Sequence, residues 1–273
     1  ADSAVPKRGW RGASTVREDR WVSDERAGRR RLWWGLGIGA GAFVLVLALL
    51  AALVLTGVLW PNRLSASRFD VRGVDVSAYQ GEIDWPTLAS QDLDFAFVKA
   101  TEGSSHVDEH FEANWSGARG THLVVGAYHF LSFESPGQRQ AAHVADTVPD
   151  AAGTLPPVVD LELYGGFLDA PPDRDEVRAI LDPLLADLEE HYGAPPIIYT
   201  TQQMRDDYLG GDYDAYPLWI RSVASSPDLP RHRWTFWQYS DRDHLDGYDG
   251  EEEHIDMNVF DGTLDDLDAM TLR

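Results

Sequence analysis

Two carboxylic acids that flank a leucine, Asp160 and Glu162, are the residues of this chain whose types and spacing best suit chemistry. Two valines precede the pair, and the run lies between Pro156-Pro157 and Tyr164-Gly165-Gly166. This pattern predicts a short buried strand that opens into a loop. Residues two apart in a strand point to the same face, roughly 6.6 Å apart along the backbone. We therefore expect both carboxyl groups to point to one place.

Such a pair is electrostatically costly, because each acid raises the pKa of the other, and structural strands rarely contain one. Cleavage of a glycosidic bond, in contrast, uses one protonated and one ionised carboxyl group beside the same sugar. The Asp160–Glu162 pair thus indicates a glycosidase. The alternative for Glu162 is a solvated loop carboxylate.

The elements that must position these acids are strands and helices that alternate along the chain. The alternation over the first two thirds favours a parallel sheet, and eight strands suggest closure into a barrel. Short connections between the last three strands predict an irregular barrel at that end. The clearest helix covers 174–192, with a capping box at Asp173 and Glu176 and a stop at Gly193. The expected strands are 70–77, 94–99, 123–130, 157–162, 196–200, 217–221, 234–239 and 255–260.

Polar side chains occur near the end of every expected strand. Active sites of α/β barrels lie at the C-terminal ends of the strands, so we expect these side chains to converge on one site. In chain order they are Asp75 and Ser77, Lys99 and Glu102, Tyr128 and His129, Asp160 and Glu162, Tyr199, Trp219, Gln238 and Asp256.

Motifs spread over residues 70–265 occur in the order and at the spacing of a known family. They are Gly73-Val74-Asp75-Val76-Ser77, Gln80-Gly81, Ile83-Asp84-Trp85, Phe97-Val98-Lys99-Ala100-Thr101-Glu102-Gly103, Asp108, Phe111, Asn114, Gly126-Ala127-Tyr128-His129-Phe130, Asp160-Leu161-Glu162, Tyr199-Thr200, Leu218-Trp219-Ile220, Trp237-Gln238-Tyr239-Ser240 and Asp256-Met257-Asn258. With these motifs the chain resembles the family 25 glycoside hydrolases, which are lysozymes (N-acetylmuramidases) of the bacterial and phage type.

The resemblance implies an α/β fold, a modified TIM-like barrel described as (β/α)5(β)3. It also implies hydrolysis of the β-1,4 bond between N-acetylmuramic acid and N-acetylglucosamine. Glu162 would be the general acid/base, and Asp160 would be either the nucleophile or the residue that stabilises the charged intermediate. We favour the second route, with net retention through the substrate's 2-acetamido group. Asp75 and Asp256 would be flanking acids of the groove, although an aspartate after a strand also often caps a loop. The segment Ile220-Arg221-Ser222-Val223 departs from the family pattern and leaves subsite detail open.

Further residues near the strand ends are expected to bind the substrate. For each aromatic ring among them, plain core packing is the alternative to contact with a sugar. Lys99 is expected to pair with an acid such as Glu102 rather than to do chemistry. The expected substrate-binding residues are Tyr128, Tyr79, Trp219, Trp237, Gln238, Tyr199, Lys99 and Glu102, and Tyr239 is a further candidate for stacking on a sugar.

An apolar run without charges covers residues 32–60, which exceeds the ~20 residues that span a bilayer. Trp33, Trp34 and Trp60 lie at its ends, as in an aromatic belt. The run is too long for the apolar part of a signal peptide, although cleavage at Ser65-Ala66-Ser67 is an alternative. We therefore expect a single transmembrane helix at 32–60 that anchors the chain in the lipid bilayer.

Charge predicts the orientation of this helix and the domain order. Residues 1–31 carry nine bases and five acids, whereas residues 61–273 carry 14 bases and 40 acids. The positive-inside rule puts the N-terminus in the cytoplasm and the acidic domain outside the cell membrane. The expected organisation is a disordered cytoplasmic tail at 1–31, the helix at 32–60, a tether at 61–68 and the barrel at 69–273. The acidic surface argues against nucleic acid as a partner, and the resemblance implies peptidoglycan glycan strands as the substrate.

The chain has no cysteine, which excludes disulfides, thiolate metal sites and thiol catalysis. His106 and His110 are four apart but lack the arrangement of a zinc motif, so we expect no metal and no cofactor. Two alternatives to a muramidase remain. One is a non-catalytic glycan-binding or scaffold barrel, and the other is a related chitinase-like glycosidase.

Overall fold

The computed structural model describes residues 18–55, 61–230 and 233–273 of the chain. The chain forms two compact units, which divide between Leu59 and Trp60. The first contains the helix α1 (Glu18–Leu55), and the second contains all the strands.

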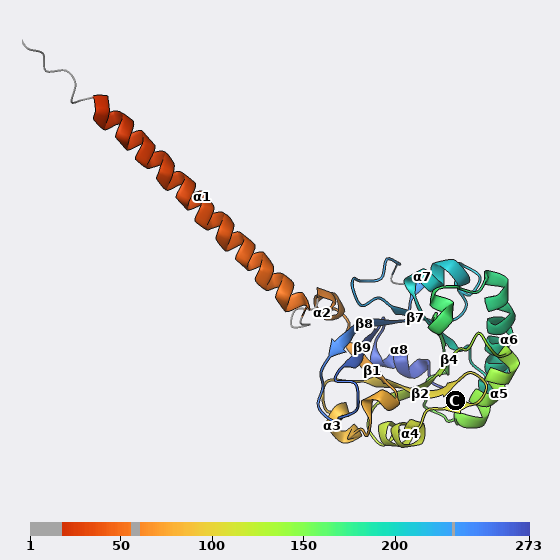
Figure 1. Ribbon diagram of the computed structural model, residues 1–273. Coiled ribbons are helices and arrows are strands. Elements are labelled where there is room, and N and C mark those ends of the chain that lie inside the picture. Colours follow the sequence, from red (N-terminus) through yellow and green to blue (C-terminus); the bar gives the residue numbers. More distant parts are fainter. Residues whose placement is uncertain (1–17, 56–60, 231–232) are drawn as a thin grey trace, which may run out of the picture. The chain divides into compact units, whose positions relative to one another are not determined.

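Eight strands of the second unit close into a barrel (Figure 1). Around the barrel the order is β1, β2, β4, β5, β6, β7, β8 and β9, and the pairing of β9 with β1 closes the ring. All neighbours are parallel except β9, which is antiparallel to both β8 and β1. The strands are β1 (Val71–Val76), β2 (Phe95–Glu102), β4 (Val124–Phe130), β5 (Val158–Leu161), β6 (Ile197–Thr201), β7 (Leu218–Arg221), β8 (Phe236–Asp243) and β9 (Ile255–Phe260).

The eight expected strands and the expected (β/α)5(β)3 barrel are therefore confirmed. Helical segments follow each of the first five barrel strands, whereas in the described residues no α-helix lies between β7 and β8 or between β8 and β9. The two-residue strand β3 (His106–Val107), which extends β2 as a hairpin, was not expected. The helical segments are η1 (Ala78–Gln80) with α3 (Trp85–Ala89), α4 (Phe111–Arg119), α5 (Gly137–Thr147), η2 (Gly165–Leu168) with α6 (Arg174–Tyr192), and α7 (Gln202–Met204) with the π-turn η3 (Arg205–Leu209).

Aromatic rings fill the barrel interior below the site. Phe95 and Phe97 on β2 contact Phe236, and Phe97 stacks on Trp219 with ring centres 4.4 Å apart. Gly73 on β1 makes room for this layer, because a Cβ there would lie 2.4 Å from the ring of Phe95. The filled interior makes this part of the barrel a packed core rather than a pore.

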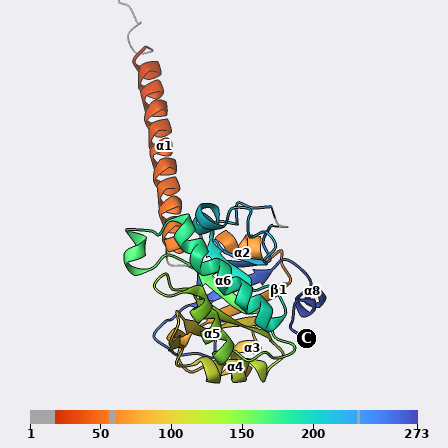
Figure 2. The same cartoon turned by 90° about the vertical axis from the view of Figure 1, so that its right-hand side faces the viewer.

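The helix α6 covers the outside of the barrel, as the sequence pattern predicts. Its capping box at Asp173 and Glu176 is present, and Gly193 ends it in the left-handed conformation with φ +67°. Figure 2 shows α5 and α6 side by side on the outer surface. Their contact is close because Gly137 has no side chain, and a Cβ there would lie 1.9 Å from the carbonyl oxygen of Ile180.

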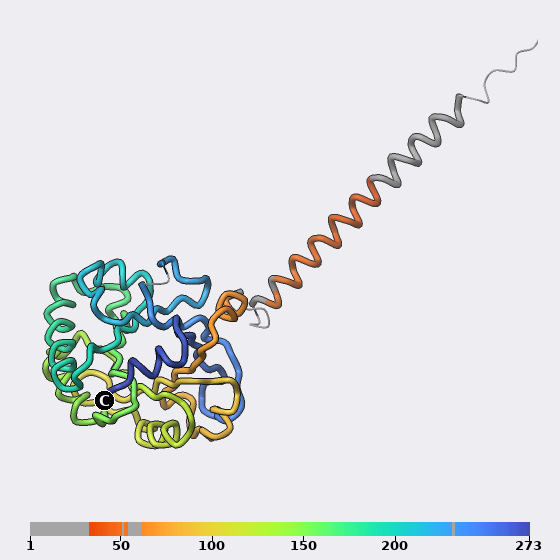
Figure 3. Tube along the Cα trace, turned by 180° about the vertical axis from the view of Figure 1, so that it is seen from behind, coloured from red at the N-terminus to blue at the C-terminus, as the bar shows by residue number. Residues whose placement is uncertain are grey.

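The expected tether at 61–68 is instead part of the barrel unit. Residues Pro61–Ala66 form the short helix α2, and Ala66 is buried. The Asn62 side chain is 2% exposed and donates to the carbonyl oxygens of Ser222 at 2.8 Å and Tyr239 at 3.1 Å. The prediction was wrong because these contacts are long-range and a local pattern does not encode them. In the trace of Figure 3 the orange start of this unit leads directly into the barrel, beside blue C-terminal segments.

The helix α1 contains one stretch, Trp33–Leu50, that is long and apolar enough to cross a membrane. The helix begins at Glu18, so residues 18–31 are helical rather than disordered as expected. Residues 18–31 contain five arginines and two glutamates, which favour helix, and they continue into the apolar helix without a proline. Residues 1–17 and 56–60, and with them parts of the expected tail and span, lie outside the described residues.

Candidate active site

The four expected acids line one small cavity at the C-terminal end of the parallel strands. Its volume is about 120 Å³, and its walls also include three aromatic side chains. Asp75 lies near the end of β1, and Asp160 lies on β5 with Glu162 just beyond it. The residues that line the cavity are Asp75, Tyr128, Asp160, Glu162, Tyr199, Trp219 and Asp256.

Asp256 reaches this cavity in a way that the sequence did not predict. It was expected at the end of the last strand, but it is the second residue of β9. Because β9 is antiparallel to β1, its beginning lies at the end of the barrel where β1 finishes, and Asp256 pairs with Asp75. A strand's direction, rather than its position in the chain, therefore brings the fourth acid to the site.

Asp160 and Glu162 form an acid pair with few hydrogen bonds. Asp160 is 6% exposed, and no residue in the described part of the chain hydrogen-bonds its Oδ1. Burial raises the pKa of Asp160 well above its usual range, and the Glu162 charge raises it further. Burial also raises the pKa of Glu162, against the opposing charge of Arg221. The pair therefore favours holding a proton over carrying two charges.

Asp75 and Asp256 are instead held by two buried amides. The Gln238 Nε2 donates to both Asp75 oxygens at 3.0 and 3.1 Å and to Asp256 at 3.1 Å. The Asn258 Nδ2 donates to Asp75 Oδ1 at 2.6 Å. Burial raises the pKa of Asp256 to about 9, with Asp75 as the next cause. Burial also raises the pKa of Asp75, although both amides oppose the rise.

Gln238 was expected to bind substrate, but it supports the acids instead. It is 1% exposed, and its Oε1 accepts a hydrogen bond from the Tyr199 hydroxyl at 3.0 Å. Asn258, to which the sequence analysis gave no role, continues this network by accepting from the Trp219 Nε1 at 2.8 Å. Asn258 lies two residues after Asp256 in a strand, so both side chains point to the same face. This spacing could have identified Asn258 from the sequence.

The expected aromatic residues have three different positions. Tyr128 and Tyr199 line the cavity, and burial raises the pKa of both hydroxyls, which keeps them protonated as donors. Trp219 also lines it but is 2% exposed, because its ring packs against Phe97 and Tyr199. Tyr79 is 61% exposed on η1, outside the cavity lining.

Trp237 and Tyr239 are in the outer core, so the expectation that they stack on a sugar was wrong. Trp237 is 1% exposed and packs against Phe69 and Trp234. The cause is strand alternation, since Gln238 points inward and its two neighbours point to the helix-covered face.

Lys99 and Glu102 form the expected ion pair at the end of β2, with 3.0 Å between Lys99 Nζ and Glu102 Oε2. The Lys99 charge opposes the rise in the pKa of Asp160. Among the described residues, no group of three or more histidines and acids is placed to hold a metal ion.

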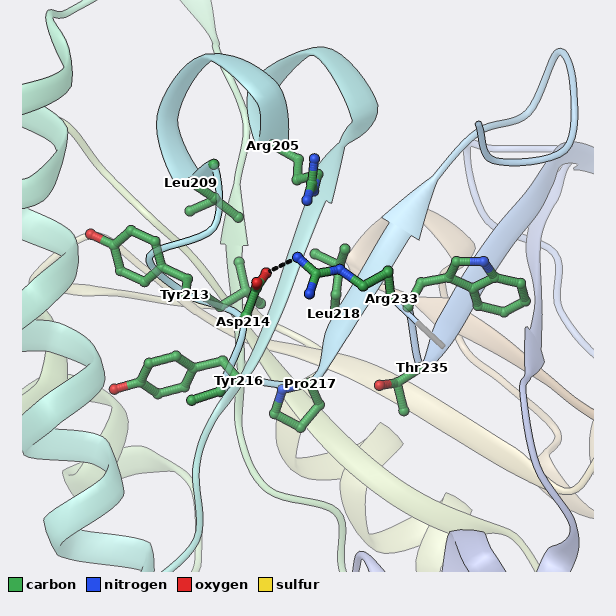
Figure 4. A pocket seen from close by; sticks show the side chains of 13 residues that line it. Arg205, Leu209, Tyr213, Asp214, Tyr216, Pro217, Leu218, Arg233 and Thr235 are labelled. Atoms are coloured by element: carbon green, nitrogen blue, oxygen red, sulfur yellow. Dashed lines mark hydrogen bonds and ion pairs between the residues drawn. The ribbon is translucent and has the colours of Figure 1, made fainter. Parts of the chain in front are cut away.

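A larger cavity of about 270 Å³ lies at the opposite end of β6 and β7 and does not contain the acids (Figure 4). Its walls include Arg205 and Tyr213, and an ion pair between Asp214 and Arg233. It lies near Ile198 and Leu218, where these strands begin, so it is separate from the site at their ends.

Comparison with known proteins decides the family. The model of "Glycosyl hydrolases family 25" matches residues 74–248, which is more than half of the chain. The chain belongs to this family. It is 36% identical to the protein YegX of Escherichia coli over 76% of this chain and 75% of that protein. It is 32% identical to lysozyme M1 of Streptomyces globisporus, over 73% of this chain and 71% of the relative. A solved family 25 glycosyl hydrolase from Bacillus anthracis is 46% identical, with a TM-score of 0.70, over 74% of this chain and 94% of that structure.

The family 25 match ends before β9, yet two residues of β9 complete the site of this glycosyl hydrolase. Asp256 and Asn258 lie beyond residue 248 and contact the acids and amides described above. The lining of the candidate site therefore extends past the matched residues, to Asp256.

Arg221 is a charged residue near the candidate site that was not among the expected site residues. It is the last residue of β7, and its Nη2 lies 2.9 Å from Asp241 Oδ2. Its charge lowers the pKa of Glu162, Asp75 and Asp256 against the effect of burial. Arg221 follows Trp219 by two residues, which puts both side chains on the inward face of one strand. This spacing could have identified Arg221 from the sequence.

Proposed function

We propose that the barrel unit is a peptidoglycan muramidase, a lysozyme that hydrolyses the β-1,4 bond between N-acetylmuramic acid and N-acetylglucosamine. The observation that carries the proposal is the cavity in which Asp160 and Glu162 meet Asp75 and Asp256. Two carboxyl groups with raised pKa beside one another suit glycoside cleavage. A relative named lysozyme M1 supports the choice of substrate.

In the proposed first step, Glu162 acts as the general acid. The carbonyl oxygen of the substrate's 2-acetamido group attacks the anomeric carbon, and the glycosidic bond breaks. The Glu162 proton moves to the leaving oxygen of the next sugar. In the second step the Glu162 carboxylate takes a proton from water, and the water oxygen displaces the acetamido oxygen from the anomeric carbon. The two displacements give net retention of configuration.

Asp160 is proposed to stabilise the cyclic intermediate of this route. We propose that its carboxylate accepts the acetamido N–H; no residue in the described part of the chain hydrogen-bonds its Oδ1. A positive charge that develops beside Asp160 favours its ionised form, because an opposite charge lowers a carboxyl pKa. The Tyr128 hydroxyl, which stays protonated, would donate to the acetamido oxygen or to a carboxylate.

The substitution Glu162→Gln tests the assignment of the general acid. We expect release of reducing ends from purified cell wall to fall by at least about 10²–10⁴-fold, because general acid catalysis contributes that much. The thermal midpoint should not fall. The matched control Glu190→Gln, at an exposed position of α6, should keep full activity. Near-normal turnover by the Glu162 variant would refute the assignment.

We also propose that α1 anchors the enzyme in the cytoplasmic membrane, with the N-terminus inside and the barrel on the wall side. The apolar stretch Trp33–Leu50 and the arginines that precede it support this topology. Protease added outside spheroplasts should digest the barrel and leave the N-terminal segment. Protection of the barrel under these conditions would contradict the topology.

A further inference from the structure

The catalytic cavity is too small to hold more than part of a glycan strand. Its volume of about 120 Å³ is below the roughly 300–1,000 Å³ that is typical of ligand pockets. A polymeric substrate must therefore continue over the rim of the barrel, and the side chains on that rim decide how it is held.

An aromatic cluster forms this rim at the ends of β4 and β5. The rings of Phe133 and Tyr164 are parallel, with centres 5.7 Å apart and an angle of 5° between their planes. Phe167 packs edge-on against both, at 5.1 and 5.2 Å, and Phe130 packs against Tyr164 at 5.3 Å. These rings are only half-buried, and the neighbouring Leu168 is 66% exposed. We call the five residues the aromatic wall.

The aromatic wall is continuous with the catalytic acids. Tyr164 follows Glu162 by two residues, and Phe130 pairs with Asp160 in the register of β4 and β5. The Nζ of Lys99 lies 5.3 Å from the centre of the Phe130 ring. A sugar chain that leaves the cavity on this side therefore meets the wall directly.

Partly buried hydrogen bonds hold the aromatic wall in place. The Tyr164 hydroxyl accepts from the Phe133 backbone N–H at 3.0 Å. Gln140, which is fully buried, donates to the carbonyl oxygens of Ser132 and Ser135 at 2.8 Å each. The loop that carries Phe133 is thus ordered before the substrate arrives, which lowers the entropic cost of binding.

We propose that the aromatic wall is a glycan-binding subsite that holds the peptidoglycan strand beyond the catalytic cavity. This inference rests on the proposed function and names the surface that would bind the polymer. Sugar rings present apolar C–H faces that can pack on exposed aromatic rings, which bury large areas with little loss of side-chain entropy. The opposite rim, at the β8–β9 loop, presents the acids Glu251, Glu252 and Glu253 instead.

Binding by the inactive full chain tests this subsite. In the Glu162→Gln background, in detergent micelles, the affinity for long purified glycan strands and for the single disaccharide repeat is measured. The double substitution Phe167→Ala/Leu168→Ala should weaken binding of long strands about tenfold. Binding of the disaccharide should change less, because two sugars are too short to cover both the cavity and the whole aromatic wall. The conservative variant Phe167→Leu, which keeps apolar volume, should fold normally and weaken long-strand binding by a smaller factor.

The matched control is Leu264→Ala, since Leu264 is 50% exposed on α8 (Leu264–Ala269), at the end of the barrel where β9 finishes. Equal affinity for long strands in the double variant and in this control would overturn the proposal. An equal loss for strands and disaccharide would also overturn it, because the wall would then act only by supporting the acids. Failure of the proposed function is distinguishable, since it would appear as no reducing-end release by the unsubstituted enzyme.

Discussion

The two acid pairs of this site are built in opposite ways. Asp160 and Glu162 come from one strand end, and Asp160 Oδ1 has no hydrogen-bond partner in the described structure. Asp75 and Asp256 lie at distant positions in the chain and are held by Gln238 and Asn258. From this difference we expect the first pair to act on the substrate and the second pair to be held in place by the two amides. Substitutions in the first pair should thus affect activity, and those in the second should also affect stability.

The largest effect after that of Glu162→Gln should come from Asp160→Asn. We expect kcat to fall about 10²–10³-fold, because a group that stabilises charge in the transition state is lost. The thermal midpoint at neutral pH should stay the same or rise, since burial disfavours the charged form of Asp160. Steady-state kinetics with calorimetry checks both. A large drop in stability would show that Asp160 helps to hold the fold. It would contradict the difference that we infer between the two acid pairs.

Gln238→Leu should have a smaller effect on kcat, about tenfold, with a clear loss of stability. The substitution leaves Asp75, Asp256 and the Tyr199 hydroxyl without their shared partner. A buried polar group without a partner costs about 1–3 kcal/mol, so the free energy of unfolding should fall by that amount. Denaturant titration measures it. An unchanged free energy of unfolding with lost activity would show that Gln238 contacts substrate instead.

Arg221→Gln should shift the pH profile. The charge of Arg221 lowers the pKa of Glu162, so its removal raises that pKa and keeps the general acid protonated to higher pH. The alkaline limb of kcat/KM should therefore move to higher pH. The control Arg205→Gln, in the separate cavity of Figure 4, should leave the limb in place. A shift to lower pH would contradict the assigned effect of Arg221.

The smallest expected effect is a pH-dependent gain in stability from Asp256→Asn. The pKa of Asp256 is raised from 3.8 to about 9 in the folded protein. A carboxyl group with a raised pKa gives its full stability below the unfolded value and loses it as pH rises toward the folded value. The variant should therefore gain a few degrees in thermal midpoint at pH 8 relative to the unsubstituted protein, and less at pH 4. A gain in thermal midpoint that increases toward low pH would contradict the raised pKa of Asp256.

The sequence predicted the local parts of this structure well. The Asp-Leu-Glu run, the eight strands and the caps of α6 follow from patterns within a few residues, and each is present. The direction of β9 was missed because a strand's residues do not encode which way its neighbour runs. The inward face of β8 was missed as well. Both faces of a barrel strand are covered, so the apolar residues of Phe236–Asp243 do not reveal that Gln238 points inward while Trp237 points outward.

The position of α2 and the role of Arg221 were missed for a related reason. The contacts of Asn62 with Ser222 and Tyr239 join residues more than 150 positions apart, and only the fold brings them together. Arg221 was interpreted as a departure from a family pattern. The electrostatic effect of its charge on the acids follows from the position of β7 in the fold, which the sequence alone does not give.

The identity of the reducing-end sugar released from defined peptidoglycan tests the central claim most directly. Mass spectrometry of the products should show N-acetylmuramic acid at the new reducing ends for the unsubstituted enzyme and no new ends for Glu162→Gln. New ends that carry N-acetylglucosamine, or equal release by the variant, would contradict the account.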